Sequence, residues 1–226
     1  MSLQDQLDAF KANLESGQPP YNVPRAVVDT MHRHTDELIT SGQAGRARKA
    51  GDKAPVFTLN DANGKPVNLA DLLARGPVVV TFYRGVWCPY CNMDLQALEA
   101  ARPEIEARGA TLVAISMQSA ANSRKAVTQN RLGFPILNDP RGEIANEFGL
   151  RFALPDYLID VYRNAFKNDL AVVNDDPSWT LPMPARYIID QDGRIAYAEV
   201  NPDYTQRPDP SELLPTLDRL RVSKAA

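Results

Sequence analysis

The pattern of apolar and polar positions changes at about residue 48. Before it, "LQDQLDAFKANLE" (3–15) and "RAVVDTMHRHTDELITSG" (25–42) carry apolar residues at helical spacing. The stretch "GQPPYNVP" between them breaks the pattern. We therefore predict that residues 1–47 form an N-terminal helical extension that covers the core or a partner subunit.

From Gly51 onward, short β-branched runs alternate with helical stretches. The runs "PVVVTFY" (77–83) and "ATLVAISM" (110–117) are continuously apolar, which is typical of strands buried on both faces. A helix is expected to begin at about residue 89, and Pro103 predicts a kink or break in it.

The later part of the chain predicts a hairpin and a final helix. The segment "ARYIIDQDGRIAYAEV" (185–200) contains the turn signal Asp192-Gly193, and "SELLPTLDRLRV" follows it. This order predicts an α/β fold with a mixed central sheet flanked by helices over residues 48–226. Residues 151–180 are long for a connection, so we predict an insertion with its own helical stretch.

Charge and cysteine content narrow the function. The chain has 226 residues, 25 basic and 28 acidic, and a net charge of −3, which argues against nucleic-acid or anionic-membrane binding. No apolar run approaches the ~20 residues of a membrane span, and the start lacks a signal-peptide pattern. We therefore expect a cytoplasmic protein, in which a close cysteine pair is more often catalytic or metal-binding than structural.

The two cysteines, Cys88 and Cys91, lie where a buried strand is expected to pass into a helix. With Cys88 as N-cap, Pro89 takes N1, where proline is favoured, and Cys91 takes N3. Both sulfurs then face the free N–H groups and positive dipole end of the first turn, which lowers a thiol pKa. Residues three apart are neighbours on a helix and can close a disulfide. The pattern indicates a redox-active dithiol.

A zinc site competes poorly with this interpretation. A structural zinc needs four ligands, and the only histidines, His32 and His34, point in different directions from a helix and are expected to face solvent. We therefore predict no metal. A purely structural Cys88–Cys91 disulfide would close a tiny loop and stabilise the fold little.

Four segments carry a family resemblance: "GDKAPVFTLNDANGKPVNLADLL", "GPVVVTFYRGVWCPYC", "FPILNDPRGEIANEFGL" and "PARYIIDQDGRI". Over about residues 48–222 the chain resembles the thioredoxin superfamily and, within it, the peroxiredoxin-like AhpC/TSA group. The resemblance implies a thioredoxin-like fold and a cysteine that reacts with peroxides or disulfides, with the Cys88/Cys91 dithiol as the redox group and no cofactor. The stretch "CPYC" also matches the dithiol of glutaredoxins.

The motif departs from ordinary peroxiredoxins. If the Phe82-Tyr83 pair is used as an anchor, Arg84 stands where that family has proline, Cys88 where it has threonine, and Cys91 at the peroxidatic position. The threonine that would orient the peroxide is thus replaced by a second thiol.

A second departure concerns the supporting arginine of that family. Counted back from Asp190, its position holds Pro184, and Met183-Pro184 resembles the cis-proline loop of thioredoxins. Arg186 is the nearest arginine, and it is either a substitute in the site or a residue on the strand surface.

The residues around the dithiol have two interpretations each. Trp87 either shields the dithiol or only packs on the insertion. Arg84 either stabilises a thiolate or peroxide, or forms a surface salt bridge. Tyr83 is expected in the core and Tyr90 at the surface.

Three functions remain open. The first is a thiol peroxidase that forms a Cys88–Cys91 disulfide, which thioredoxin, glutaredoxin or glutathione reduces. The second is a dithiol–disulfide oxidoreductase in which Cys88, expected to be the more exposed sulfur, attacks a substrate disulfide and Cys91 resolves the mixed disulfide. The third is a non-enzymatic redox sensor or binding module. The N-terminal extension also favours a homodimer.

Overall fold

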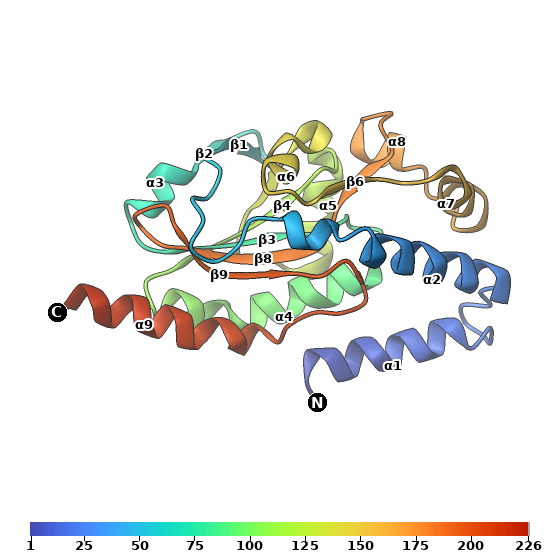
Figure 1. The fold of residues 1–226 in the computed structure, drawn as a ribbon, viewed down its shortest axis with the longest axis horizontal. Helices are drawn as coiled ribbons and strands as arrows, with labels where there is room; N and C mark the ends of the chain where they lie inside the picture. Colours follow the sequence, from blue (N-terminus) through green and yellow to red (C-terminus); the bar gives the residue numbers. More distant parts are fainter. Residues whose placement is uncertain (226) are drawn as a thin grey trace.

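A mixed sheet forms the centre of the protein (Figure 1). The computed structural model describes residues 1–225, and in them the sheet has seven strands in the order β2-β1-β5-β4-β3-β8-β9. Its strands are β1 (Thr58–Asp61), β2 (Pro66–Asn68), β3 (Val78–Phe82), β4 (Thr111–Ser116), β5 (Ile136–Asn138), β8 (Ala185–Ile189) and β9 (Ile195–Val200). Strands β3, β4 and β5 are parallel, and β8 runs antiparallel to β3. The predicted thioredoxin-like α/β fold is confirmed.

The central strands are buried on both faces because their side chains alternate between two apolar clusters. In β3, Val79 packs on one side, with α4, while Val78, Val80 and Phe82 pack on the other. Strand β4 repeats the pattern, which explains why both runs read as continuously apolar. The carboxyl end of β3 opens directly into the loop that carries the dithiol.

Helices cover both faces of the sheet and flank it (Figure 1). They are α1 (Leu3–Glu15), α2 (Arg25–Thr40), α3 (Leu69–Leu73), α4 (Pro89–Glu106), α5 (Ala120–Asn130), α6 (Glu143–Glu147), α7 (Asp156–Asp160), α8 (Leu170–Asn174) and α9 (Leu214–Ala225). The 3-10 turns η1 (Gln43–Arg46), η2 (Pro140–Gly142) and η4 (Pro210–Leu213) join some of them. Helix α4 continues through Pro103 to its end at Glu106, so the predicted break does not occur.

The segment predicted as an insertion contains α7, the π-helical turn η3 (Val161–Ala165) and α8. It is framed by a small antiparallel pair, β6 (Arg151–Ala153) and β7 (Thr180–Pro182). An apolar cluster of its own holds it together, with Tyr162 and Trp179 as its largest members. This cluster reaches the dithiol loop through Trp87.

Helix α1 packs on α4 and is anchored in the main core. Leu3 and Leu7 are 4% and 0% exposed and belong to the same apolar cluster as Leu95 of α4. Ser2 caps the helix, because its side chain accepts the N–H of Asp5 while the Asp5 carboxylate accepts the N–H of Ser2. None of the helices in residues 1–225 is long and apolar enough to cross a membrane.

Candidate active site

The dithiol lies at the junction between β3 and α4, where the sequence places it. Cys88 is the N-cap of α4 and Pro89 its N1 residue. The chain makes a tight approach just before, because a Cβ at Gly85 would lie 2.4 Å from Nε1 of Trp87. Only glycine fits that position without displacing the indole.

The two sulfurs face each other inside the protein. Cys88 Sγ and Cys91 Sγ are 2.8 Å apart, and both cysteines are reduced. Cys88 is 1% exposed and Cys91 0%, so both sulfurs are buried, and Cys88, expected to be the more exposed, is the one that lines the neighbouring cavity. Burial of both groups protects them from bulk solvent, and their separation lets them close a disulfide after a small movement.

Two arginines act on the Cys91 sulfur. Arg207 Nη2 lies 3.7 Å from Cys91 Sγ, and the whole Arg207 side chain is buried. Burial raises the pKa of Cys91, but the hydrogen bond from Cys88 and the charges of Arg207 and Arg84 outweigh it and lower the pKa to about 6. Cys91 is therefore a thiolate at neutral pH.

Cys88 has the opposite behaviour. Burial and the neighbouring Cys91 sulfur raise its pKa well above the ordinary value, and the charges of Arg84 and Arg207 only partly offset this. Cys88 therefore stays protonated and donates its S–H to the Cys91 thiolate. The site therefore contains one nucleophile, the Cys91 thiolate, and one protonated thiol, Cys88.

The pH dependence follows from this assignment. Because the pKa of Cys91 is lowered, its thiolate forms as pH rises through about 6 and is lost below that value. We expect the far-ultraviolet thiolate absorbance of the reduced protein to rise by one thiolate with a midpoint near pH 6. The Cys91→Ser variant is the control and should lack that step. A single step near the ordinary cysteine pKa of ~8.5 would contradict the assignment.

A buried ion-pair network holds Arg207 in place. Asp94, 2% exposed, lies one helical turn after Cys91, and its Oδ2 is 3.5 Å from Arg207 Nε. Its other oxygen pairs with Nη2 of Arg186 on β8. The carboxylate compensates two buried guanidinium groups, and removing one partner of such a network commonly costs about 3–5 kcal/mol.

Arg84 and Arg186 are both buried but lie at different positions relative to the dithiol. Arg186 is 1% exposed and bonds Asp94 and the Pro208 carbonyl (3.1 Å from Nη1), so it reaches the dithiol only through Asp94. Arg84 is 4% exposed, bonds the Tyr162 hydroxyl, and has its Cζ 4.0 Å from the Tyr204 ring centroid. The alternatives of a surface salt bridge for Arg84 and a strand-surface position for Arg186 are wrong.

A cavity of about 390 Å³ opens beside Cys88. Most of its lining is apolar or aromatic, and it comes from α1, α2, the dithiol motif, the insertion and Tyr204. The lining residues are Leu14, Met31, Arg84, Trp87, Cys88, Pro89, Tyr90, Tyr162, Phe166, Lys167, Asn168 and Tyr204. Two buried donors in this lining, Arg84 Nε and Trp87 Nε1, have no hydrogen-bond partner among the described residues. They are available to a polar ligand beside the sulfur.

Trp87 and Tyr90 both belong to the walls of the site. Trp87 packs edge-to-face on Tyr162 of the insertion, with ring centroids 5.3 Å apart, and it also lines the cavity beside Cys88. It therefore combines the two predicted roles, packing on the insertion and covering the dithiol. Tyr90 is 3% exposed and packs on Phe10 of α1 at 5.1 Å, so the prediction of a surface residue is wrong. Its neighbours from both ends of the chain exclude water from it.

Met183-Pro184 does not form the predicted cis-proline loop. The only cis peptide bond in the described residues is Pro19–Pro20, so Met183–Pro184 is not cis. Pro184 lines a small cavity with Arg84 and His34 instead. His34 is also not solvent-facing, since both ring nitrogens are buried and the ring stacks on Phe152.

Tyr83 lies in the core, as predicted, and fixes the loop. Its hydroxyl accepts from Gln118 Nε2 at 2.7 Å, and Gln118 Oε1 accepts the N–H of Val86 at 2.8 Å. Asn92 Nδ2 donates to the Val86 carbonyl at 2.7 Å. The loop between strand and helix is thus fixed on both sides before the dithiol begins.

Sequence reasoning missed Arg207 and Asp94. Arg207 lies in a segment without helix or strand, 116 residues from Cys91, and no motif surrounds it. Asp94 had a signal, because it lies three residues after Cys91 and so on the same face of α4. Among the described residues no group of three or more His, Cys, Asp or Glu side chains is placed to hold a metal ion.

The fold and the buried dithiol define a thiol-dependent oxidoreductase with a thioredoxin-like fold. The AhpC/TSA family model matches residues 50–198, and the chain belongs to this family.

Named relatives are consistent with that assignment. A Mycobacterium tuberculosis protein named as a peroxiredoxin, Rv1608c, is 32% identical over 121 residues, which cover 54% of this chain and 79% of the relative. The thiol-disulfide oxidoreductase ResA of Bacillus cereus is 25% identical over 146 residues, or 64% of this chain and 66% of ResA. The crystal structure of peroxidoxin BcpB from Mycobacterium tuberculosis shares the fold with a TM-score of 0.59 and 24% identity, over 76% of this chain and 97% of that one.

Proposed function

We propose that the protein is a thiol peroxidase that reduces hydrogen peroxide or organic hydroperoxides through the Cys88/Cys91 dithiol. One observation carries the proposal: the buried Cys91 sulfur lies 3.7 Å from a guanidinium and 2.8 Å from a second thiol. The first neighbour stabilises the nucleophile and the second stands ready to resolve its product. Membership of the AhpC/TSA family supports the same reaction.

The steps follow from the two protonation states. The Cys91 thiolate attacks one peroxide oxygen, the O–O bond breaks, and Cys91 becomes a sulfenic acid while the leaving oxygen takes a proton to form water or alcohol. The free N–H groups of Arg84 and Trp87 in the cavity wall would stabilise charge on the leaving oxygen. The Cys88 thiol then attacks the sulfenic sulfur, which forms the Cys88–Cys91 disulfide and releases water.

An external thiol completes the cycle. Thioredoxin, glutaredoxin or glutathione would reduce the disulfide by thiol exchange. We further propose that the protein works in the cytoplasm, where such thiols are kept reduced, and that it assembles into a homodimer. No cofactor is needed, since both electrons come from the dithiol.

A second candidate is a dithiol–disulfide oxidoreductase. The observation in its favour is that Cys88, and not Cys91, lines the cavity. In that order Cys88 would attack a substrate disulfide first, and Cys91 would resolve the mixed disulfide.

Oxidation of the reduced wild-type protein tests the proposal. We expect one equivalent of hydrogen peroxide or of an alkyl hydroperoxide to convert both thiols to an intramolecular disulfide, much faster than it oxidises a free thiol. Rapid mixing followed by mass spectrometry measures both the rate and the product. Oxidation at the rate of a free thiol, together with rapid reduction of disulfides, would replace the peroxidase by the second candidate.

A further inference from the structure

Gln4 of α1 contacts the backbone of the segment that carries Arg207. Its Oε1 accepts the N–H of Arg207 at 2.9 Å, and its Nε2 lies 3.4 Å from the Thr205 carbonyl. These contacts join residues more than 200 positions apart in the chain.

The segment between residues 201 and 209 needs such contacts because it contains no helix or strand. Two other α1 contacts reach it: Lys11 Nζ lies 3.5 Å from the Thr205 hydroxyl, and the N–H of Leu3 lies 3.4 Å from the Asp209 carboxylate. Helix α1 therefore defines the path of this segment from one side, and the sheet and α4 define it from the other.

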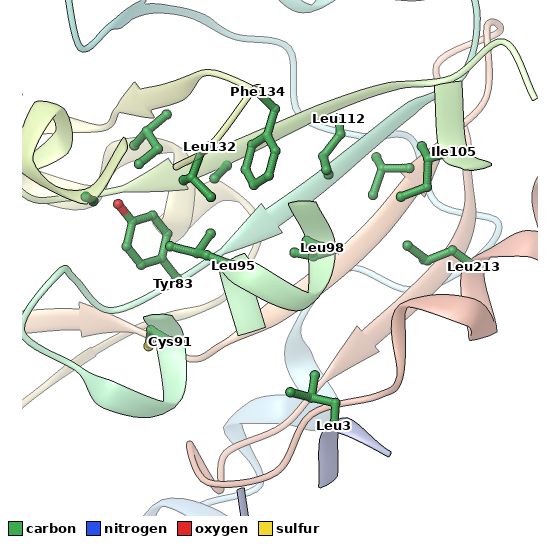
Figure 2. Close-up of a cluster of buried hydrophobic side chains, with 14 of the residues drawn as sticks. Leu3, Tyr83, Cys91, Leu95, Leu98, Ile105, Leu112, Leu132, Phe134 and Leu213 are labelled. Atoms are coloured by element: carbon green, nitrogen blue, oxygen red, sulfur yellow. The ribbon is translucent and has the colours of Figure 1, made fainter. Parts of the chain in front are cut away.

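Helix α1 is held in place by packing on the core. Leu3 and Leu7 are buried in the same cluster as Cys91, and Figure 2 shows Leu3 beside the core that carries that cysteine. Phe10 packs on Tyr90 inside the dithiol motif. The helix is thus fixed relative to the sulfur that Arg207 must reach.

We propose that Gln4 is a positioning residue of the active site, which holds the Arg207 backbone so that its guanidinium lies against Cys91. The inference rests on the proposed function, in which Cys91 is the reacting thiolate. It makes α1, which lies outside the residues matched by the family model, a working part of the site.

The test compares Gln4→Ala with Gln6→Ala, a change at an exposed glutamine on the same helix. Loss of the Gln4 hydrogen bonds to this segment should move the Cys91 titration up by less than one pH unit, because the Arg207 charge itself remains. At pH 6 the smaller thiolate fraction corresponds to a rate with peroxide that is about two- to fivefold lower. Gln6→Ala should match the wild type. The primary measurement is the far-ultraviolet thiolate absorbance, with circular dichroism to confirm folding.

A double variant separates positioning from a general structural effect. Combined with Arg207→Gln, the Gln4→Ala change should move the titration no further, because the cation it positions is gone. An unchanged titration in Gln4→Ala, or an equal further change in the double variant, would overturn the proposal. Since the absorbance needs no peroxide, failure of the peroxidase reaction in wild type would be seen separately.

Discussion

Cys91→Ser is expected to lose the fast reaction with peroxide, whereas Cys88→Ser is expected to keep a single turnover. The remaining thiol in Cys91→Ser is Cys88, whose pKa burial raises well above its ordinary value. At pH 7 Cys88 is therefore mostly protonated, whereas about nine-tenths of a thiol of pKa about 6 is thiolate, so the rate should fall by more than about tenfold.

In Cys88→Ser the nucleophile and its arginines remain, but no thiol can resolve the product. A sulfenic acid should therefore accumulate on Cys91 and become trapped by a sulfenic-acid reagent, and excess peroxide should oxidise it further. Stopped-flow kinetics and mass spectrometry of the two variants measure the order of attack. Both carry the same substitution, so each serves as the control of the other.

The reverse result would have a clear meaning. A fast sulfenic acid in Cys91→Ser, with a slow reaction in Cys88→Ser, would assign the first attack to the sulfur that lines the cavity. The thiolate assignment of Cys91 would then be wrong.

Arg207→Gln is expected to weaken the nucleophile itself. An opposite charge within about 4–6 Å typically shifts a pKa by about 1–3 units, so the pKa of Cys91 should rise from about 6 to about 7–9. The thiolate fraction at pH 7 then falls from about nine-tenths to between about one half and about 1%. The peroxide rate at pH 7 should drop by about two- to a hundredfold.

The matched controls are Arg207→Lys and Arg25→Gln. The lysine keeps the charge but loses the planar group that reaches both Asp94 and the sulfur, so an intermediate pKa is expected. Arg25 is 77% exposed on α2, and its replacement should change nothing. Titration of the thiolate absorbance and thermal unfolding are measured together. A folded Arg207→Gln protein with a wild-type titration would remove Arg207 from the site.

The parts of the site that are local in sequence could be predicted, and the rest could not. Cys88, Pro89 and Cys91 share one helical turn, so spacing and N-cap chemistry placed them correctly. The sheet was predictable because the β3 and β4 runs are apolar on both faces.

Burial around the dithiol escaped the sequence because it comes from distant segments. Tyr90 looked like an exposed helical residue, but Phe10 and Tyr204 cover it from opposite ends of the chain. Arg84 was ambiguous for the same reason, since its partner Tyr162 belongs to the insertion. Neither periodicity nor a motif reports such contacts.

The contact of Gln4 with Arg207 also has a consequence for synthesis of the chain. Arg207 follows Cys91 by 116 residues, which take about 6 to 23 seconds to make at about 5–20 residues per second. Throughout that interval the cysteine lacks the Arg207 guanidinium, one of the groups that lower its pKa in the folded protein. In the nascent chain Cys91 therefore ionises less readily. Its pKa reaches the value of the folded site only after Arg207 has packed between α1 and α4.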